Sequence, residues 1–299
     1  QPRPSLCSPE LGKLLTIGAA QYRQLVKRTA LRRINRTSLL RNVAVALGNV
    51  GTPADLPLMG VAMLREPALV REHFDLRECA EWQARYNIAP QSDVLVIRQR
   101  PRLGRVGQMV RWGLIPRWAK GASIGLKLNN ARAETVVEKP SFRTSFERHR
   151  CLIPANGFYE WQAVAGQKRK QPYFIHRQDD EPLAFAGLWA EWRGQVAGEQ
   201  VVVRSTTIIT TEANETMAPV HDRMPVILPR RAWDDWLDPS NLQVERLQPL
   251  LVPAPASLLT MHPVSTDVSN VRNVGRHLAE PIPAEQVLGA GDPEQQSLL

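Results

Sequence analysis

A carboxylate and an imidazole stand in apolar stretches of the sequence, where they would suit general acid–base chemistry. Glu160 lies between two aromatic residues in ANGFYEW, residues 155–161. A carboxylate beside aromatic rings can have its pKa raised into the range that is useful for proton transfer. His221 lies in VHDRMP, residues 220–225, with an Asp and an Arg after it. Each residue also has an ordinary alternative, because most Glu are surface carboxylates and a lone His rarely does chemistry.

A third stretch places amide, guanidinium and carboxylate groups at a regular interval. LNNARAET, residues 128–135, spaces Asn130, Arg132 and Glu134 two residues apart. Side chains alternate between the two faces of a strand, so an extended chain would present these three on one face. Such a face could bind a polar ligand.

A fourth stretch combines aromatic and basic residues. RWGLIPRWAK, residues 111–120, holds Trp112 and Trp118 beside Arg and Lys. Nucleic-acid-binding proteins use this mixture to stack bases and to hold phosphates. The alternative for both tryptophans is a place in the core, where large aromatic side chains are usual. Taken singly, the four stretches indicate only a β-rich intracellular protein that contacts nucleic acid.

Short apolar runs separated by Gly, Pro and Asp predict the strands that would position these residues. From about residue 84 they are DVLVIRQ, QMVRWGLIP, CLIPANGFYEW, QPYFIHR, PLAFAGLWAEW, RSTTIITT and RMPVILP. One clear helix, PRRAWDDWL, is expected at 229–237. Many strands with few helices indicate an α+β fold, a mostly antiparallel sheet curled toward a barrel. Residues 284–299 have little to bury, so we expect a disordered tail.

The N-terminal residues 1–60 have a different, helical pattern. Ser8 and Pro9 suit a helix start, and Gly48 and Gly51 suit a helix end. The short helices suggest the remnant of a helical-repeat array, placed before a second domain. Nine Arg or Lys stand here against two acids, which accounts for +7 of the net charge of +9. This basic segment would bind nucleic acid or form a solvated helix face.

The Cys and His patterns predict no metal site and no cofactor. Cys7, Cys79 and Cys151 form no CxxC pair, and the six histidines form no HExxH motif. No apolar run approaches the length of a membrane-spanning helix, and the first residues lack the apolar core of a secretion signal. We therefore expect a cytoplasmic protein without membrane contact, acting as a monomer.

Six motifs together carry a family resemblance. RYNIAP, RWGLIPRWAK, NARAET, CLIPANGFYEW, HDRMPVIL and MHPVSTDVSNVRN occur in this order over about residues 64–283. In order and spacing they resemble the SOS response-associated peptidase family, whose members process abasic sites in DNA. The resemblance implies binding to single-stranded DNA that carries an abasic site. It also implies a covalent crosslink, in which the α-amine and thiol of an N-terminal Cys form a thiazolidine with the sugar aldehyde.

The resemblance also implies roles for individual residues. Asn130 would orient the sugar ring, Glu160 would shuttle protons, and His221 would help to open the deoxyribose and to reverse the link. Arg132 would hold a phosphate. Wedging against bases at the lesion is implied for Trp118 and Pro90. Three further residues are placed on the DNA-binding surface: Asn87, Trp112 and Arg223.

The family's first motif is missing. Members begin Met-Cys-Gly-Arg, and this motif should lie near residues 55–63, where the sequence reads LPLMGVAML without a Cys. The residues before the three cysteines are Leu6, Glu78 and Arg150, so Met removal exposes none of them. We infer that the binding cleft is retained and that the crosslinking Cys is lost. GVAML either replaces the missing first strand or leaves an open sheet edge.

Two other interpretations remain open. One is a single-stranded DNA-binding module without catalysis, with salt-sensitive contacts. The other concerns LRRINRTSLLRNVAVALGN in residues 1–60, which resembles the C-terminal HEAT-like repeats of epoxyqueuosine reductases, enzymes that modify tRNA. That resemblance implies a fusion that contacts RNA through its basic helical segment.

Overall fold

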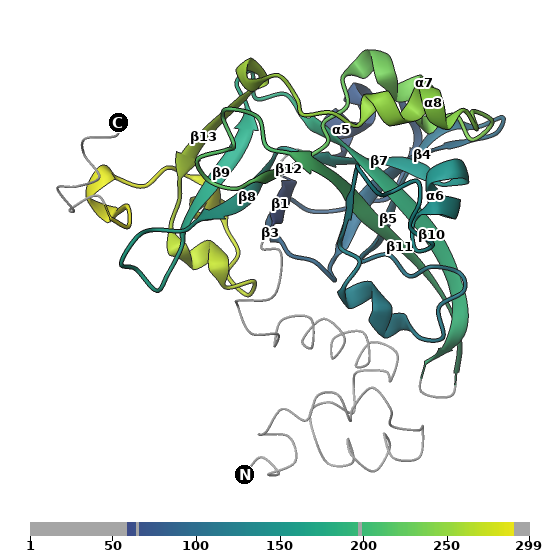
Figure 1. Cartoon of the computed structure of the whole chain (residues 1–299), viewed down its shortest axis with the longest axis horizontal. Helices are drawn as coiled ribbons and strands as arrows, with labels where there is room; N and C mark the ends of the chain where they lie inside the picture. Colours follow the sequence, from purple (N-terminus) through teal and green to yellow (C-terminus); the bar gives the residue numbers. More distant parts are fainter. Residues whose placement is uncertain (1–58, 64–65, 197–198, 290–299) are drawn as a thin grey trace, which may run out of the picture.

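The computed structural model describes residues 59–63, 66–196 and 199–289 (Figure 1). The basic helical segment expected over residues 1–60 lies almost wholly outside the described residues, and so does the RNA contact inferred for it. No helix of the described part is long and apolar enough to cross a membrane. The remaining chain is mostly β, with four α-helices, and this confirms the predicted fold class.

Five strands close into a barrel. In the order β11-β10-β7-β4-β5 each strand pairs antiparallel with its neighbour. Parallel pairs between β5 and β11, at Ser205↔Arg111 and Thr206↔Trp112, complete the circle. The bounds are β4 (Asp93–Arg100), β5 (Gly104–Trp112), β7 (Arg150–Ala155), β10 (Leu183–Val196) and β11 (Glu199–Glu212). Three short strands extend the barrel: β2 (Leu76–Cys79) on β5, and β6 (Asn130–Arg132) and β12 (Arg223–Pro225) on β11.

A second sheet has the strand order β13-β9-β8-β1-β3 and is antiparallel throughout. Its strands are β1 (Gly60–Met63), β3 (Arg85–Ile88), β8 (Gly157–Gln162), β9 (Gln171–Arg177) and β13 (Leu259–Pro263). GVAM therefore does form a strand. It is buried along its whole length and lies between β8 and β3, so it takes the place of the missing first strand.

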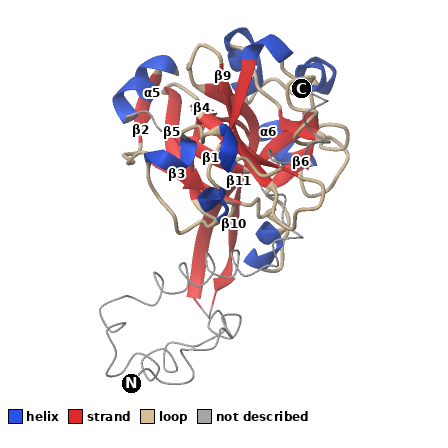
Figure 2. Ribbon diagram, turned by 90° about the vertical axis from the view of Figure 1, so that its left-hand side faces the viewer, coloured by secondary structure: helices blue, strands red, loops and turns tan. Residues whose placement is uncertain are grey.

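Helices and turns lie around the strands (Figure 2). The α-helices are α5 (Pro67–His73), α6 (Arg143–Arg148), α7 (Trp233–Leu237) and α8 (Val244–Leu247). The 3-10 helices are η2 (Ala122–Leu126), η3 (Arg230–Ala232), η4 (Gln248–Leu250), η5 (Ala256–Leu258), η6 (Thr266–Ser269), η7 (Arg276–Ala279) and η8 (Ala284–Gln286). The helix expected at 229–237 is confirmed as η3 followed by α7.

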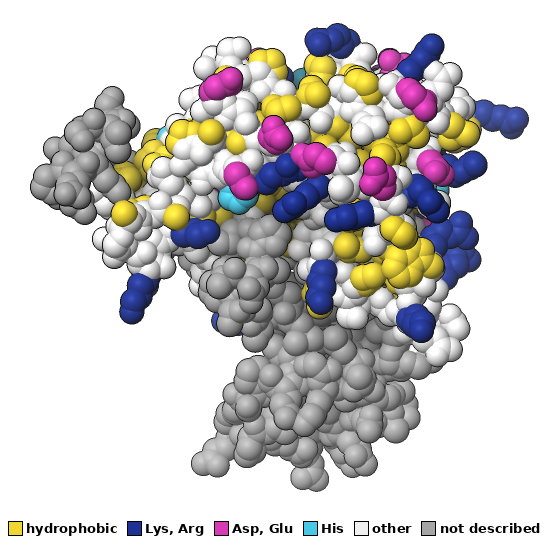
Figure 3. All heavy atoms as spheres, in the orientation of Figure 1, with side chains coloured by type: hydrophobic (Ala, Val, Ile, Leu, Met, Phe, Trp, Pro, Cys, Tyr) yellow, Lys and Arg dark blue, Asp and Glu magenta, His cyan; other side chains and the backbone are white. Residues whose placement is uncertain are grey.

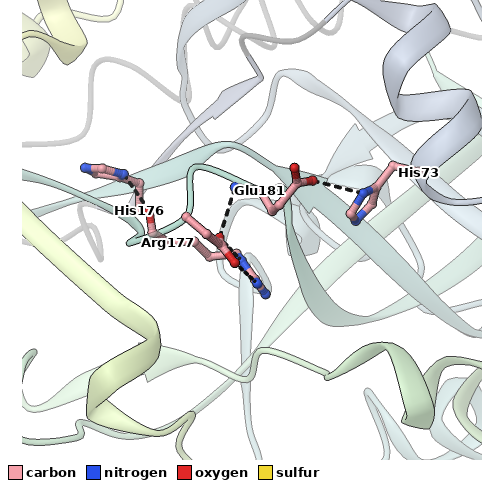
Figure 4. A network of polar contacts seen from close by, with 5 residues as sticks. His73, His176, Arg177 and Glu181 are labelled. Atoms are coloured by element: carbon pink, nitrogen blue, oxygen red, sulfur yellow. Dashed lines mark hydrogen bonds and ion pairs between the residues drawn. The ribbon is translucent and has the colours of Figure 1, made fainter.

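Polar contacts tie α5, the helix that follows β1, to the turn between β9 and β10 (Figure 4). His73 Nδ1 lies 3.2 Å from a carboxylate oxygen of Glu181. The Glu181 amide donates to Asp179 at 3.1 Å, and Arg177 Nε donates to the same carboxylate at 2.7 Å. The chain that leaves β1 is thus held against an element of the second sheet.

Two expectations about local structure are wrong. NARAET is extended only over β6, because the chain turns after Arg132, so Glu134 does not share a strand face with Asn130. The expected tail begins too early. Residues 284–289 are described and include η8, and the Leu288 amide donates to Gln171 at 3.0 Å.

Hydrogen exchange tests whether β1 is a strand. Because β1 pairs on both sides, we expect amides of residues 60–63 to be protected to a degree similar to those of β8. Residues 166–169, exposed in the turn after β8, serve as the fast-exchanging internal reference. Exchange of 60–63 at the rate of that turn would contradict the pairing.

Candidate DNA-binding site

The C-terminal half of β11 brings two of the sequence motifs together. β6 pairs with it in parallel, through Ile208↔Asn130 and Thr210↔Arg132. β12 pairs with it antiparallel, through Thr210↔Pro225. NAR and HDRMP, which are about ninety residues apart in the chain, therefore lie on the two sides of one strand.

Asn130 carries a polar atom that is prepared for a ligand. Its Oδ1 is buried and has no hydrogen-bond partner among the described residues. The carbonyl of the preceding residue, Asn129, accepts from Trp112 Nε1 at 2.8 Å and from Thr207 Oγ1 at 2.9 Å, so the backbone here is fixed. A buried acceptor without a donor costs about 1–3 kcal/mol. A ligand hydroxyl at this position would remove that cost.

Glu160 is a buried acid rather than a surface carboxylate. Only 6% of its surface is exposed. Its pKa is raised to about 8, mainly by burial; Lys170 and the Trp161 amide act in the opposite direction, and Asp222 adds a smaller increase. The pKa is raised, as the aromatic neighbours predict. A carboxyl group that titrates near neutral pH can both give and take a proton.

The register of β1 indicates where Met59 lies relative to this acid. β1 pairs with β8 through Gly60↔Tyr159 and Val61↔Phe158, so continuing the register by one residue puts Met59 opposite Glu160. The pair Val61↔Ile88 with β3 continues in the same way toward Pro90. Met59 is 2% exposed and packs in the main core cluster. The residue directly before β1 is therefore a buried Met.

His221 is held at the edge of the site by its own loop. The Arg223 amide donates to His221 Nδ1 at 3.0 Å, so Nε2 carries the proton of the neutral ring. Asp222 Oδ1 lies 3.1 Å from the same Nδ1, and it accepts a hydrogen bond from Nδ1 only when that nitrogen carries a proton. Gln162 Nε2 donates to the Pro219 carbonyl at 2.9 Å, which ties this loop to the end of β8.

Two of the expected DNA contacts are exposed. Arg132 follows Asn130 by two residues and is open to solvent. Trp118 is 58% exposed, with its Nε1 donating to the Pro140 carbonyl at 3.3 Å. An exposed aromatic ring with a fixed edge is suited to stacking.

Three other expected contacts have structural partners. Trp112 is fully buried, so the prediction that it contacts DNA directly is wrong, and the alternative of a core residue holds. Arg223 donates to Glu134 from Nη1 at 2.7 Å and from Nη2 at 2.9 Å, and Nη2 also donates to the Thr210 carbonyl. Asn87 Nδ2 donates to carbonyls of the loop around η6, the nearest at 3.0 Å, and so holds that loop on β3.

Sequence reasoning missed Gln91. This residue is 4% exposed, and its Nε2 donates to Asn129 Oδ1 at 2.7 Å and to the Gly125 carbonyl at 3.0 Å. Its Oε1 accepts from Arg111 Nε at 3.1 Å. Gln91 therefore fixes the backbone from which Asn130 projects, and its only sequence signal is a polar residue directly after Pro90.

Substitution of Glu160 by Gln tests the raised pKa. Between about pH 4.5 and 8 the unfolded chain loses this proton while the folded chain keeps it, so the wild type loses stability as pH rises through this window. Gln does not titrate. We expect Glu160→Gln to match the wild type near pH 4.5 and to be more stable by up to a few kcal/mol at pH 8, since one pKa unit is about 1.4 kcal/mol.

Melting temperatures of both proteins from pH 4.5 to 9 measure this effect. The same scan on Glu245→Gln, an exposed Glu of α8, is the control. A difference between Glu160→Gln and the wild type that stays constant across the pH range would contradict the raised pKa.

The model of the SOS response associated peptidase (SRAP) family matches residues 60–271, so the match begins at the first residue of β1. The abasic site processing protein YoaM of Bacillus subtilis (strain 168) is 42% identical over 200 residues, which are 67% of this chain and 86% of that protein. The abasic site processing protein HMCES of Gallus gallus is 33% identical over 251 residues, covering 72% and 73%.

Solved structures share the fold. A protein from Bordetella bronchiseptica matches with a TM-score of 0.59 and 30% identity, over 70% of this chain and 99% of that one. A protein from Bacteroides thetaiotaomicron matches with a TM-score of 0.67 at 24% identity, over 75% and 99%.

Proposed function

Because this chain belongs to the SOS response associated peptidase family, we propose that it binds single-stranded DNA at abasic sites. The buried acid Glu160 carries the proposal, together with the unpartnered oxygen of Asn130. Neither feature stabilises the fold, and both have a use when a sugar with hydroxyl groups occupies the site.

The proposed chemistry is the opening of the abasic sugar. In the closed form the sugar is a hemiacetal, and opening moves a proton from the anomeric hydroxyl to the ring oxygen. Glu160, with a pKa of about 8, and the imidazole of His221 supply the two proton-transfer groups. Asn130 Oδ1 accepts from a sugar hydroxyl and fixes the ring. Arg132 holds a neighbouring phosphate, and Trp118 and Pro90 fill the gap left by the missing base.

The crosslink of the family is not available to this chain. A thiazolidine needs an α-amine and a thiol on one N-terminal residue. We align Gly60, where the family match begins, with the Gly of the Met-Cys-Gly-Arg motif, which assigns Met59 to the Cys position and Val61 to the Arg position. Met59 offers a thioether and a peptide nitrogen, and neither adds to an aldehyde. The proposed activity is therefore binding and sugar opening without a stable covalent product.

Binding to a strand of about 9 nucleotides tests the proposal, with an abasic site or an ordinary nucleotide at the centre. We expect the full chain to prefer the abasic strand about tenfold and to give no heat-stable band on a denaturing gel. Asn130→Ala should abolish the preference, because the sugar contact is lost. Arg132→Gln should weaken binding to both strands. It should also lower the slope of log affinity against log salt concentration by about 0.7, the value for one phosphate.

Arg231→Gln, an exposed Arg of η3, is the matched control for loss of one charge. Equal binding of the two strands by the wild type would refute the proposed function. If Asn130→Ala still prefers the abasic strand, a residue other than Asn130 makes the sugar contact.

Restoring the nucleophile tests the place of Met59. In the full chain, Met59→Cys is preceded by the recognition sequence of a protease that cuts directly before residue 59. After cutting, the introduced cysteine has a free amine and thiol opposite Glu160, and we expect a heat-stable crosslink to the abasic strand. Uncut protein and cut Met59→Ala are the controls, since neither joins an amine to a thiol. Retained binding without a crosslink would show that Met59 does not lie at the sugar.

A further inference from the structure

A hollow with several arginines opens away from the candidate site. β5 pairs with β2 over its first residues and with β11 only at its end, through Arg111 and Trp112. Along β5, between its pairing with β2 and its pairing with β11, lies a hollow of about 520 Å³. Its lining includes Arg98, Arg100, Arg204 and Gln108. We call this the arginine hollow.

Arg204 and Thr210, which pairs with Arg132 of the candidate site, are six residues apart on β11. At about 3.3 Å per residue this is roughly 20 Å, so the arginine hollow is a separate place on the surface.

Glu78 also lines the arginine hollow, and acids balance its positive charge only in part. Glu78 lies 3.9 Å from Arg100, and Glu191 lies 3.1 Å from Arg204 but also pairs with Arg193. The pKa of Arg98 is lowered first by burial and then by the positive charges of Arg204 and Arg100, so Arg98 lies close enough to both guanidinium groups to be repelled by them. Their planar N–H donors match the oxygens of a phosphate, which would relieve the repulsion.

A line of basic groups joins the arginine hollow to Trp118. Arg98 lies over the Trp189 ring at 4.8 Å, and His149 lies 4.6 Å from the same ring. Burial lowers the pKa of His149, and so do the charges of Arg117 and Arg148, which are therefore close to it. Arg117 directly precedes Trp118. Lys and Arg side chains gather along the right-hand side of Figure 3, over α6 and β10.

We propose that the arginine hollow binds backbone phosphates of the same single-stranded DNA, beyond the lesion, on the part of the strand that leaves past Trp118. The proposal rests on the proposed function for the identity of the strand. The arginine hollow would be a second DNA contact, which only a strand longer than the candidate site can reach. Affinity should therefore increase with strand length.

Strand length and a double substitution test the proposal in the full chain. Arg100→Gln/Arg204→Gln removes two exposed guanidinium groups and leaves the half-buried Arg98 in place. Arg231→Gln/Arg246→Gln removes the same charge from exposed positions of η3 and α8. Affinities are measured for strands of about 9 and about 30 nucleotides, abasic and undamaged, from about 50 to 300 mM salt, with melting temperatures of all variants.

The arginine-hollow variant should bind the long strand about 5- to 20-fold more weakly and lower its salt slope by about 1.4, the value for two phosphates. Its affinity for the short strand should change less than twofold. The control variant should change less than twofold with both strands. Equal effects of the two variants on the long strand, or an equal loss with the short strand, would overturn the proposal.

The two proposals fail separately. The proposed function fails if abasic and undamaged short strands bind equally, whereas the arginine hollow is judged on the undamaged long strand. Inorganic pyrophosphate, titrated by calorimetry, distinguishes a small phosphate ligand from a strand. If pyrophosphate binds only when Arg100 and Arg204 are present, but the long strand is unaffected by their loss, the ligand is a small phosphate compound and the strand proposal is overturned.

Discussion

Backbone pairing between β1 and β8 is the constraint on which the candidate site depends. The four residues of β1 are buried and sit between two strands, so a slip of one residue would turn every β1 side chain to the other face. This register brings Met59 opposite Glu160 and fixes where the chain enters the site. The pairing needs apolar residues that fit the strand, not a Cys or an Arg. The strand can therefore persist after the motif that makes the family's nucleophile has changed.

The residues around this strand retain features that cost stability. Glu160 is buried at a pKa of about 8, and Asn130 Oδ1 lacks a donor among the described residues. Arg150, which is also buried, instead donates to five carbonyls. Arg150 thus ties β7 to its neighbours, whereas Asn130 Oδ1 has no comparable set of bonds within the described residues. Glu160 and Asn130 are the basis of the proposed binding activity, which does not need a nucleophile.

Sequence patterns predicted the parts of the fold that depend on local periodicity. The strand runs from about residue 84 and the helix ending at Leu237 follow from apolar runs and turn residues, whereas the sequence left open whether Gly60–Met63 forms a strand. What could not be predicted depends on partners distant in the chain. Trp112 looked like a stacking residue because its basic neighbours are visible in the sequence, whereas its burial beside Asn129 is not. The arginine hollow likewise gathers residues from several strands, and no motif joins them.

A crystal structure of the full chain with an abasic single strand tests the central claim most directly. The account predicts that the opened sugar lies against Asn130, Glu160 and His221, with Met59 beside it and no bond between protein and DNA. A covalent bond from any side chain to the sugar would contradict the loss of the nucleophile. An abasic sugar bound away from Glu160 would contradict the site itself.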